Sequence, residues 1–150
     1  MSPEPQTGSS WVQEYLAAWS SHDAARVTSF VTDDVVYTDA ALGERFEGAA
    51  AVRRFIDDMT RSFSTDVTFT PGQLIVATAD LYAAEWTMAG TNDRAAEDRG
   101  LPITGKRFEI AGVSIGRLRD GKISENHDYW DMATFLNQVG LSPQPQGAIE

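Results

Sequence analysis

The chain has 150 residues, and 12 basic against 22 acidic side chains give it a formal net charge of −10. The length fits one domain, and 42% hydrophobic residues are enough to build a globular core. The absence of cysteine excludes disulfides, a thiol nucleophile and cysteine-ligated zinc or iron–sulfur sites.

The charge and its distribution also exclude classes of partner. A strongly acidic chain without a basic patch repels nucleic acid backbones, so we expect no nucleic acid partner. Apolar runs stay well short of the roughly 18 residues of a membrane span, and residues 1–10 lack the basic-then-apolar order of a signal peptide. We expect a soluble, cytoplasmic protein that does not bind membranes.

Residues 1–9 and 142–150 are rich in proline, serine and glycine, and we assign them to flexible ends around one domain, 10–141. Ser10 and Gln13 form a capping-box pattern that predicts the start of a first helix. The apolar stripe of this helix includes Tyr15 and Trp19. Asp23 can cap a short second helix.

A β-branched strand is predicted over 35–39, a turn-rich stretch over 40–48, and then a third amphipathic helix. From 66 onward the hydrophobic period changes to two. The pattern predicts a strand bent at Pro71-Gly72, strands over 81–91 and 106–119, a hairpin at Asp120-Gly121, and a strand over 122–130. Residues 92–102 form a polar loop, and a last helix over 132–139 ends at Gly140.

Helices first and long strands afterwards indicate the α+β class. We expect a curved, mostly antiparallel sheet wrapped around a pocket that the N-terminal helices close. Such a concave pocket is suited to a hydrophobic small molecule.

Several segments carry a family resemblance, namely FEGAAAVRRFI, the stretch LPITGKRFEIAGVSIGRLRDGKISENHDYWD, and FLNQVGL. In these segments the chain resembles the SnoaL-like polyketide cyclases of the nuclear transport factor 2-like superfamily. The resemblance implies a cone-shaped α+β barrel, a pocket that works without a cofactor, and a homodimer formed through the outer sheet face.

Asp39 ends the first predicted strand and shares a face with Val35 and Tyr37. If this face is internal, burial raises the pKa of the carboxyl and makes it a better base near neutral pH. Alternatively, Asp39 is a turn residue that binds nearby amides. The resemblance favours the first interpretation, because ketosteroid-isomerase-like members and related epoxide hydrolases carry a basic aspartate at this place.

The last strand carries a second candidate pair. His127, Tyr129 and Asp131 alternate on one face, and Asn126, Asp128 and Trp130 take the other. We predict that Asp131, assisted by His127, performs acid/base work, because SnoaL-like cyclases place a catalytic aspartate on this strand. Asp131 also precedes a helix, where aspartate is a natural N-cap, and a lone strand histidine is often only a packed group.

The remaining candidates would surround a substrate. The resemblance to ketosteroid isomerases implies that Tyr15 donates a hydrogen bond to a developing oxyanion. Aromatic and sulfur side chains are predicted to bind a flat apolar substrate or, alternatively, to pack in the core: Trp19, Trp86, Met88, Phe108 and Tyr129.

We find no metal-ligand cluster and no nucleotide-binding motif, so no cofactor or metal is expected. The sequence favours an acid/base enzyme that closes a ring on an apolar carbonyl compound. The alternatives are epoxide opening, a ketosteroid-type isomerisation, and a non-catalytic binding module. Val113, Ile115 and Arg117 alternate with smaller residues, and we expect this bulky face to lie outside, in the homodimer contact.

Overall fold

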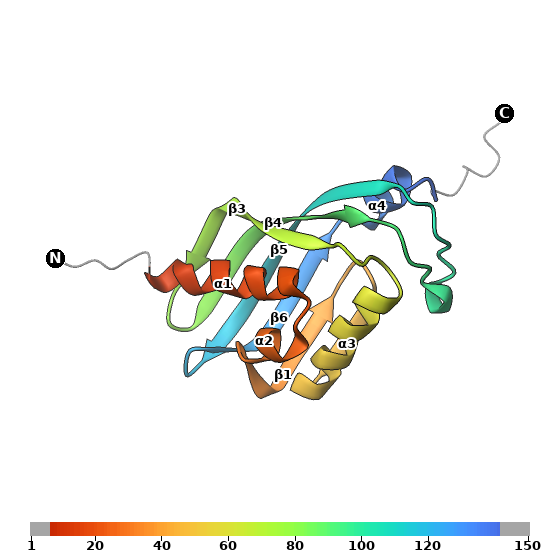
Figure 1. Ribbon diagram of the computed structural model, residues 1–150. Coiled ribbons are helices and arrows are strands. Elements are labelled where there is room, and N and C mark those ends of the chain that lie inside the picture. The colour runs from red at the N-terminus through yellow and green to blue at the C-terminus, as the bar shows by residue number, and fades with distance from the viewer. Residues whose placement is uncertain (1–6, 142–150) are drawn as a thin grey trace.

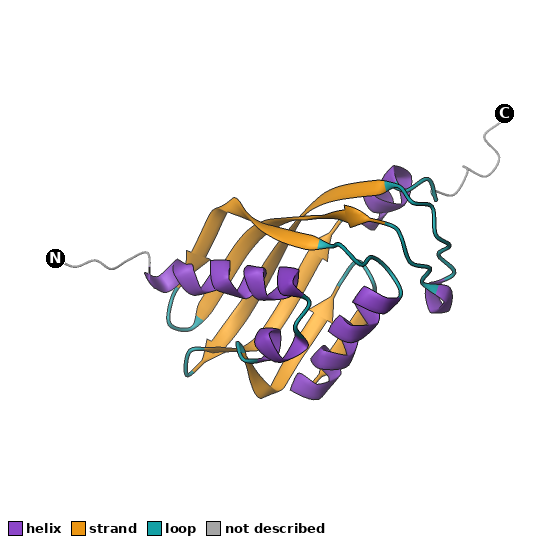
Figure 2. Cartoon of the chain, in the orientation of Figure 1, coloured by secondary structure: helices purple, strands orange, loops and turns teal. Residues whose placement is uncertain are grey.

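The computed structural model describes residues 7–141 of the chain as an open sheet with helices on one side (Figures 1 and 2). The helices are α1 (Thr7–Ser21), α2 (Ala24–Thr28), α3 (Ala49–Arg61) and α4 (Met132–Gln138), with a 3₁₀ turn, η1 (Glu97–Arg99). The strands are β1 (Val31–Asp39), β2 (Glu44–Glu47), β3 (Thr68–Ala77), β4 (Leu81–Thr91), β5 (Arg107–Arg119) and β6 (Lys122–Trp130).

The six strands form one sheet in the order β2-β1-β6-β5-β4-β3. Neighbouring strands are antiparallel except for β1 and β6, which run parallel. Helices α1, α2 and α3 lie across one face of the curved sheet, and α4 packs at the end of β5 (Figure 1). The α+β prediction is therefore confirmed, although the sheet stays open between β2 and β3.

The core fills the space between this inner face and the helices. Aliphatic side chains from both layers are fully buried there: Val12, Val27, Val35, Val52, Ile56, Val67 and Ile123. Within the described residues, no helix has both the length and the apolar character needed to cross a membrane.

Local sequence signals account for most element boundaries. Asp23 caps α2 as predicted, accepting hydrogen bonds from the amides of Ala25 and Arg26 at 3.1 and 3.2 Å. The pairing of β3 with β4 shifts register after Pro71, which confirms the predicted bend. The β5–β6 hairpin turns at Asp120 and Gly121 with φ angles of 53° and 80°.

Two predictions about the front half are wrong. Helix α1 begins at Thr7, so Ser10 lies inside the helix and is not its cap. Strand β2 occupies part of the predicted turn region and pairs with β1, because the polar pattern ERFE alternates across an edge strand with one face exposed. Of the two predicted flexible ends, 1–6 and 142–150 lie outside the described residues, whereas 7–9 are helical.

The inner face of β6 also differs from the prediction. Ser114 of β5 is buried and pairs with Asp128, whereas Ile115 is 48% exposed and pairs with His127. Directly paired residues share a face, so Asp128 lies inside and His127 outside. The bulky face of β5 lies outside as predicted, but the choice of His127, Tyr129 and Asp131 as the inner set is wrong.

Position 112 of β5 has to be a glycine, because the Trp86 side chain of β4 occupies the space next to it. It pairs with Trp86, and a Cβ at this position would overlap the Trp86 indole ring. We expect Gly112→Ala to lower the free energy of unfolding by about 1–3 kcal/mol, because the indole has to move. Urea unfolding measures this effect, with Ala111→Ser on the opposite, exposed face as the control. Equal stability of Gly112→Ala and wild type would contradict this packing.

Candidate active site

A cavity of about 290 Å³ lies between the inner face of the sheet and helices α1 and α3. Nine aromatic side chains line it: Tyr15, Trp19, Tyr37, Phe46, Phe55, Phe63, Phe69, Trp86 and Trp130. Met88 adds a flexible apolar side chain. A volume at the lower end of the range for ligand pockets indicates a compact apolar ligand.

Asp39 enters this cavity from the end of β1. Its side chain is almost fully buried and accepts hydrogen bonds from the Leu42 amide (2.9 Å) and from Nε1 of Trp130 (3.1 Å). Burial raises the pKa of Asp39, and these two hydrogen bonds counteract part of the rise. Each carboxylate oxygen keeps acceptor capacity that a ligand can use.

Asp128 enters from β6 and is held by three uncharged donors. Its Oδ1 accepts from the Ser114 hydroxyl (2.6 Å) and from the Asn126 amide (2.9 Å), and its Oδ2 accepts from the Tyr37 hydroxyl. Burial raises the pKa of Asp128 to about 6, and the charge of Asp39 adds to the rise. At neutral pH this carboxyl is mainly ionised, and its pKa suits a general base.

A second layer of buried groups orients these donors. Nε1 of Trp86 donates to the Ser114 hydroxyl at 2.8 Å, which leaves the Ser114 proton for Asp128. The Tyr82 hydroxyl donates to Oδ1 of Asn126, which directs the Asn126 amide protons toward Asp128. Asn126 and Tyr82 are buried and lie behind the cavity wall, so they position Asp128 without lining the cavity.

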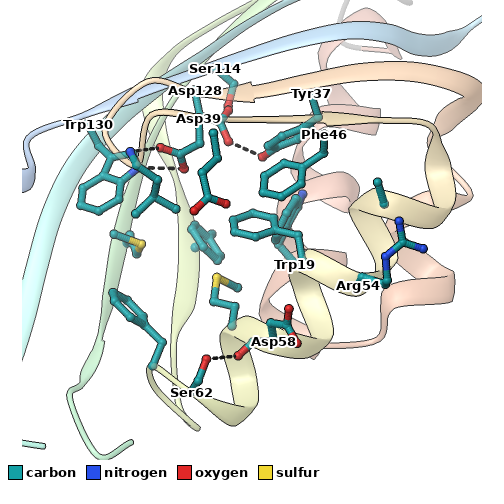
Figure 3. Close-up of a pocket in the computed structure, with 18 of the residues that line it drawn as sticks. Trp19, Tyr37, Asp39, Phe46, Arg54, Asp58, Ser62, Ser114, Asp128 and Trp130 are labelled. Carbon is teal, nitrogen blue, oxygen red and sulfur yellow. Dashed lines mark hydrogen bonds between the residues drawn. The ribbon is translucent and has the colours of Figure 1, made fainter. Parts of the chain in front are cut away.

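The two carboxylates come together because of the β1–β6 pairing. Asp39 and Asp128 are direct partners in this parallel pair and point into the same cavity (Figure 3). Because two nearby carboxylates repel each other when both are ionised, the charge of Asp39 raises the pKa of Asp128. The arrangement can therefore remove a proton at one carboxyl and supply one from the other.

Of the predicted catalytic residues, Asp39 and Tyr15 lie in the cavity. Burial and the nearby charge of Asp128 raise the pKa of Tyr15, so its hydroxyl stays protonated and able to donate. The predicted wall residues Trp19, Trp86 and Met88 also line the cavity.

The other predicted residues are not among those that line the cavity. Asp131 is an exposed N-cap of α4 that accepts from the Thr134 amide at 3.0 Å, and hydrogen bonds from Thr134 lower its pKa. His127 lies on the outer face, with Nε2 2.7 Å from the Glu125 carboxylate. Tyr129 is 47% exposed on that same face, whereas Phe108 packs in the core against Phe135.

Sequence reasoning missed Asp128 together with its donors Ser114 and Asn126. The available signal is the face of β5 with smaller residues, which contains Ser114 and lies opposite the bulky face that is predicted to lie outside. Pairing that face with β6 places Asp128 inside, but the sequence does not show the register of the hairpin. His127 favours the opposite face of β6 as the inner one, because histidine is a common acid/base residue.

The mouth of the cavity carries charged residues from three elements. Arg99 of η1 forms an ion pair with Glu44 of β2 at 2.6 Å, which joins the 92–105 segment to the sheet edge. Arg54 and Asp58 of α3 also border the opening. Across the described part of the chain, no three potential metal ligands of the His, Cys, Asp or Glu type gather in one place.

A family model for the SnoaL-like domain matches residues 12–126. The chain belongs to the SnoaL-like family. The match includes Asp39, whereas Asp128 and Trp130 lie just beyond it.

Solved structures with the same fold support this assignment. A candidate polyketide cyclase from Xanthomonas campestris is 25% identical with a TM-score of 0.75, over 90% of this chain and 98% of that one. A second candidate polyketide cyclase, from Pseudomonas putida, is 25% identical with a TM-score of 0.73, over 88% and 97%. A hypothetical protein from Catenulispora acidiphila with a ketosteroid isomerase-like fold, solved in complex with trimethylamine, is 20% identical with a TM-score of 0.72, over 97% of this chain and 100% of that one. At this identity the likeness supports the fold alone.

The buried Asp128 carboxyl should also make the free energy of unfolding depend on pH. Because folding raises its pKa from 3.8 to about 6, its contribution to stability is present below pH 3.8 and is lost as the pH rises through about 6. Asp128→Asn does not lose this stability as the pH rises, because asparagine does not titrate. Relative to wild type, the variant should therefore gain at most about 3 kcal/mol between about pH 4 and pH 8.

Urea unfolding of both proteins at the two pH values measures this difference, because the titrations of groups that are not coupled to Asp128 cancel. Asp131→Asn is the control with the opposite sign, since hydrogen bonds lower the pKa of that carboxyl. A stability difference between Asp128→Asn and wild type that does not change with pH would show that Asp128 has an ordinary pKa.

Proposed function

We propose that this SnoaL-like protein is an acid/base enzyme of the polyketide cyclase type that acts on a compact, apolar carbonyl compound. The observation that carries the proposal is the pair of buried carboxylates, Asp39 and Asp128, on paired strand positions that line one cavity rich in aromatic side chains. The 25% identical candidate cyclases support the reaction class.

Asp128 acts as the base. Three of its four acceptor positions are occupied by Tyr37, Ser114 and Asn126, and the remaining one lies on Oδ2. This oxygen takes the proton from the carbon next to a substrate carbonyl, and the C–H electron pair becomes the enolate. The fixed neutral donors stabilise the carboxylate without lowering its pKa to that of an exposed aspartate.

Tyr15 serves as the donor to the enolate oxygen. Tyr15 lines the cavity and its hydroxyl stays protonated, so it can stabilise the negative charge as it develops. The enolate carbon then attacks a second carbonyl of the same molecule and forms the ring bond. The oxygen of that carbonyl takes up the proton held by the carboxylate pair, which returns the enzyme to its starting charge.

The first step can be tested without knowledge of the natural substrate. The probe is 2-tetralone, a compact bicyclic ketone, and the measurement is exchange of its α-protons for deuterium in D₂O, followed by proton NMR. Asp128→Asn should lower the enzyme-dependent exchange rate by about 10²–10⁴-fold, because the base is lost. Asp131→Asn, which changes an exposed aspartate on the same strand end, should keep the wild-type rate.

Loss of exchange in Asp131→Asn with retention in Asp128→Asn would overturn this assignment of the base. Wild-type protein that binds 2-tetralone without accelerating exchange would instead identify a non-catalytic binding module.

Asp39→Asn probes the coupling between the two carboxyls. The charge of Asp39 raises the pKa of Asp128, so its removal should shift the rising limb of the pH–rate profile to lower pH. The measurement is the exchange rate of 2-tetralone as a function of pH in wild type and variant. An unchanged profile would show that the two carboxyls titrate independently.

Tyr15→Phe tests the oxyanion donor. The variant keeps the aromatic ring in the core and removes only the hydroxyl, so the fold should be retained. We expect the exchange rate to fall by about 10²–10³-fold, the usual effect of losing one oxyanion donor. Tyr82→Phe, which removes a hydroxyl behind the cavity wall, should have a smaller effect, and equal losses in both variants would contradict a direct role for Tyr15.

A further inference from the structure

Among the described residues, no arginine, lysine or histidine forms a hydrogen bond or ion pair with Asp39 or Asp128. The polar contacts of Asp39 and Asp128 in the described structure come from uncharged groups, namely hydroxyl, amide and indole donors. Arg99 is the cation with an electrostatic effect on Asp39, and its guanidinium is already paired with Glu44. The cavity end of β1 and β6 is therefore strongly negative.

The other arginine at the opening does not compensate this charge. Arg54 lies beyond Phe46, on the side away from Asp39 and Asp128 (Figure 3). Asp98 borders the same opening and adds negative charge, whereas Asp58 forms an ion pair with Arg61 at 2.9 Å. A ligand that enters this cavity therefore meets an excess of negative charge at the inner end, where Asp39 and Asp128 lie.

The walls opposite the carboxylates are continuous aromatic surface. The Trp19 ring lies 5.8 Å from the rings of both Tyr37 and Phe69, and 6.3 Å from that of Phe55. Phe46 stacks on Phe55 at 4.5 Å. The faces of aromatic rings attract organic cations, and the attraction is strongest where water is excluded.

We propose that the natural ligand of this cavity is an apolar molecule with a protonated or quaternary amine, bound between the aromatic wall and Asp39. This inference rests on the proposed function in that it names the substrate class of the same site. The cationic group neutralises Asp39 and leaves Asp128 as the base for a carbonyl elsewhere in the molecule.

Three probes of similar size separate charge from shape. They are phenyltrimethylammonium, its uncharged isostere tert-butylbenzene, and the anion benzenesulfonate. Three of the four tryptophans of the chain, Trp19, Trp86 and Trp130, line the cavity, so intrinsic fluorescence reports occupancy. We expect the cation to bind at least about tenfold more tightly than tert-butylbenzene, and the anion to bind more weakly than both.

Two charge-matched variants locate the cationic group. Asp39→Asn should reduce the preference for phenyltrimethylammonium over tert-butylbenzene by about tenfold, with little change in the affinity for tert-butylbenzene. Asp57→Asn removes the same charge from an exposed position of α3 outside the cavity and should leave the preference unchanged. Phe55→Leu should weaken the binding of phenyltrimethylammonium more than the binding of tert-butylbenzene, because it removes an aromatic face but keeps an apolar side chain.

Equal or weaker binding of the cation relative to tert-butylbenzene in the wild type would overturn the proposal, as would no saturable binding of the cation. A preference lost equally in Asp39→Asn and Asp57→Asn would also overturn it, since the overall charge would then be the cause. None of these outcomes bears on proton exchange of 2-tetralone, which is uncharged. Failure of the exchange experiment, with the cation preference intact, would reject the catalytic proposal alone.

Discussion

Strands β1 and β6 run parallel near one side of the sheet, and their register sets Asp39 directly across from Asp128. Side chains of paired residues project to the same face, and this face is closed over by α1 and α3. Two carboxyl groups are consequently held next to each other away from bulk water. Every chemical property proposed for the cavity depends on this one contact between strands that are distant in sequence.

Such a pair is costly to bury, and the surrounding residues show how the fold tolerates it. Hydroxyls of Tyr37 and Ser114 and the amide of Asn126 satisfy Asp128, while Trp130 and the Leu42 amide satisfy Asp39. Neutral donors stabilise a carboxylate less than a paired arginine would, so the pKa of Asp128 stays near 6. An arginine in their place would give a more stable ion pair and a weaker base.

The donors are themselves fixed by the core. Trp86 and Tyr82 on β4 donate hydrogen bonds to Ser114 and Asn126, and α4 packs Phe135 against the Trp130 indole. The absence of a side chain at Gly112 gives the Trp86 ring its space. The cavity thus depends on residues of β4, β5, β6 and α4. A change in the packing of these elements alters the hydrogen bonds of the carboxyl groups through these contacts.

The sequence predicted the fold class and most elements, because hydrophobic periodicity and turn residues such as Asp120-Gly121 are local signals. It also predicted that Asp39 faces the cavity, since Val35 and Tyr37 mark the buried face of β1. The inner face of β6 could not be read in the same way. Both of its alternating sets contain an aromatic and an aspartate, and the choice depends on pairing with Ser114 and Asp39 in other strands.

The same limit explains Asp131 and strand β2. An aspartate before a helix serves as an N-cap wherever the helix lies, so its position alone does not distinguish a cap from a base. The short strand β2 has a polar sequence and is defined by its pairing with β1 rather than by its own residues. Pairing between strands that are distant in sequence, and not local propensity, determines where Asp131 lies relative to the cavity and whether residues 44–47 form a strand.

The most direct test of the account is the titration of the cavity carboxyl groups themselves. Carbon-13 NMR of aspartate-labelled protein, with Asp39→Asn and Asp128→Asn used for assignment, gives the apparent pKa values of the pair. The account predicts one titration near pH 6 that disappears in Asp128→Asn. If all aspartate carboxyls instead titrate below about pH 4.5, in the range of solvated side chains, the buried pair does not exist as described.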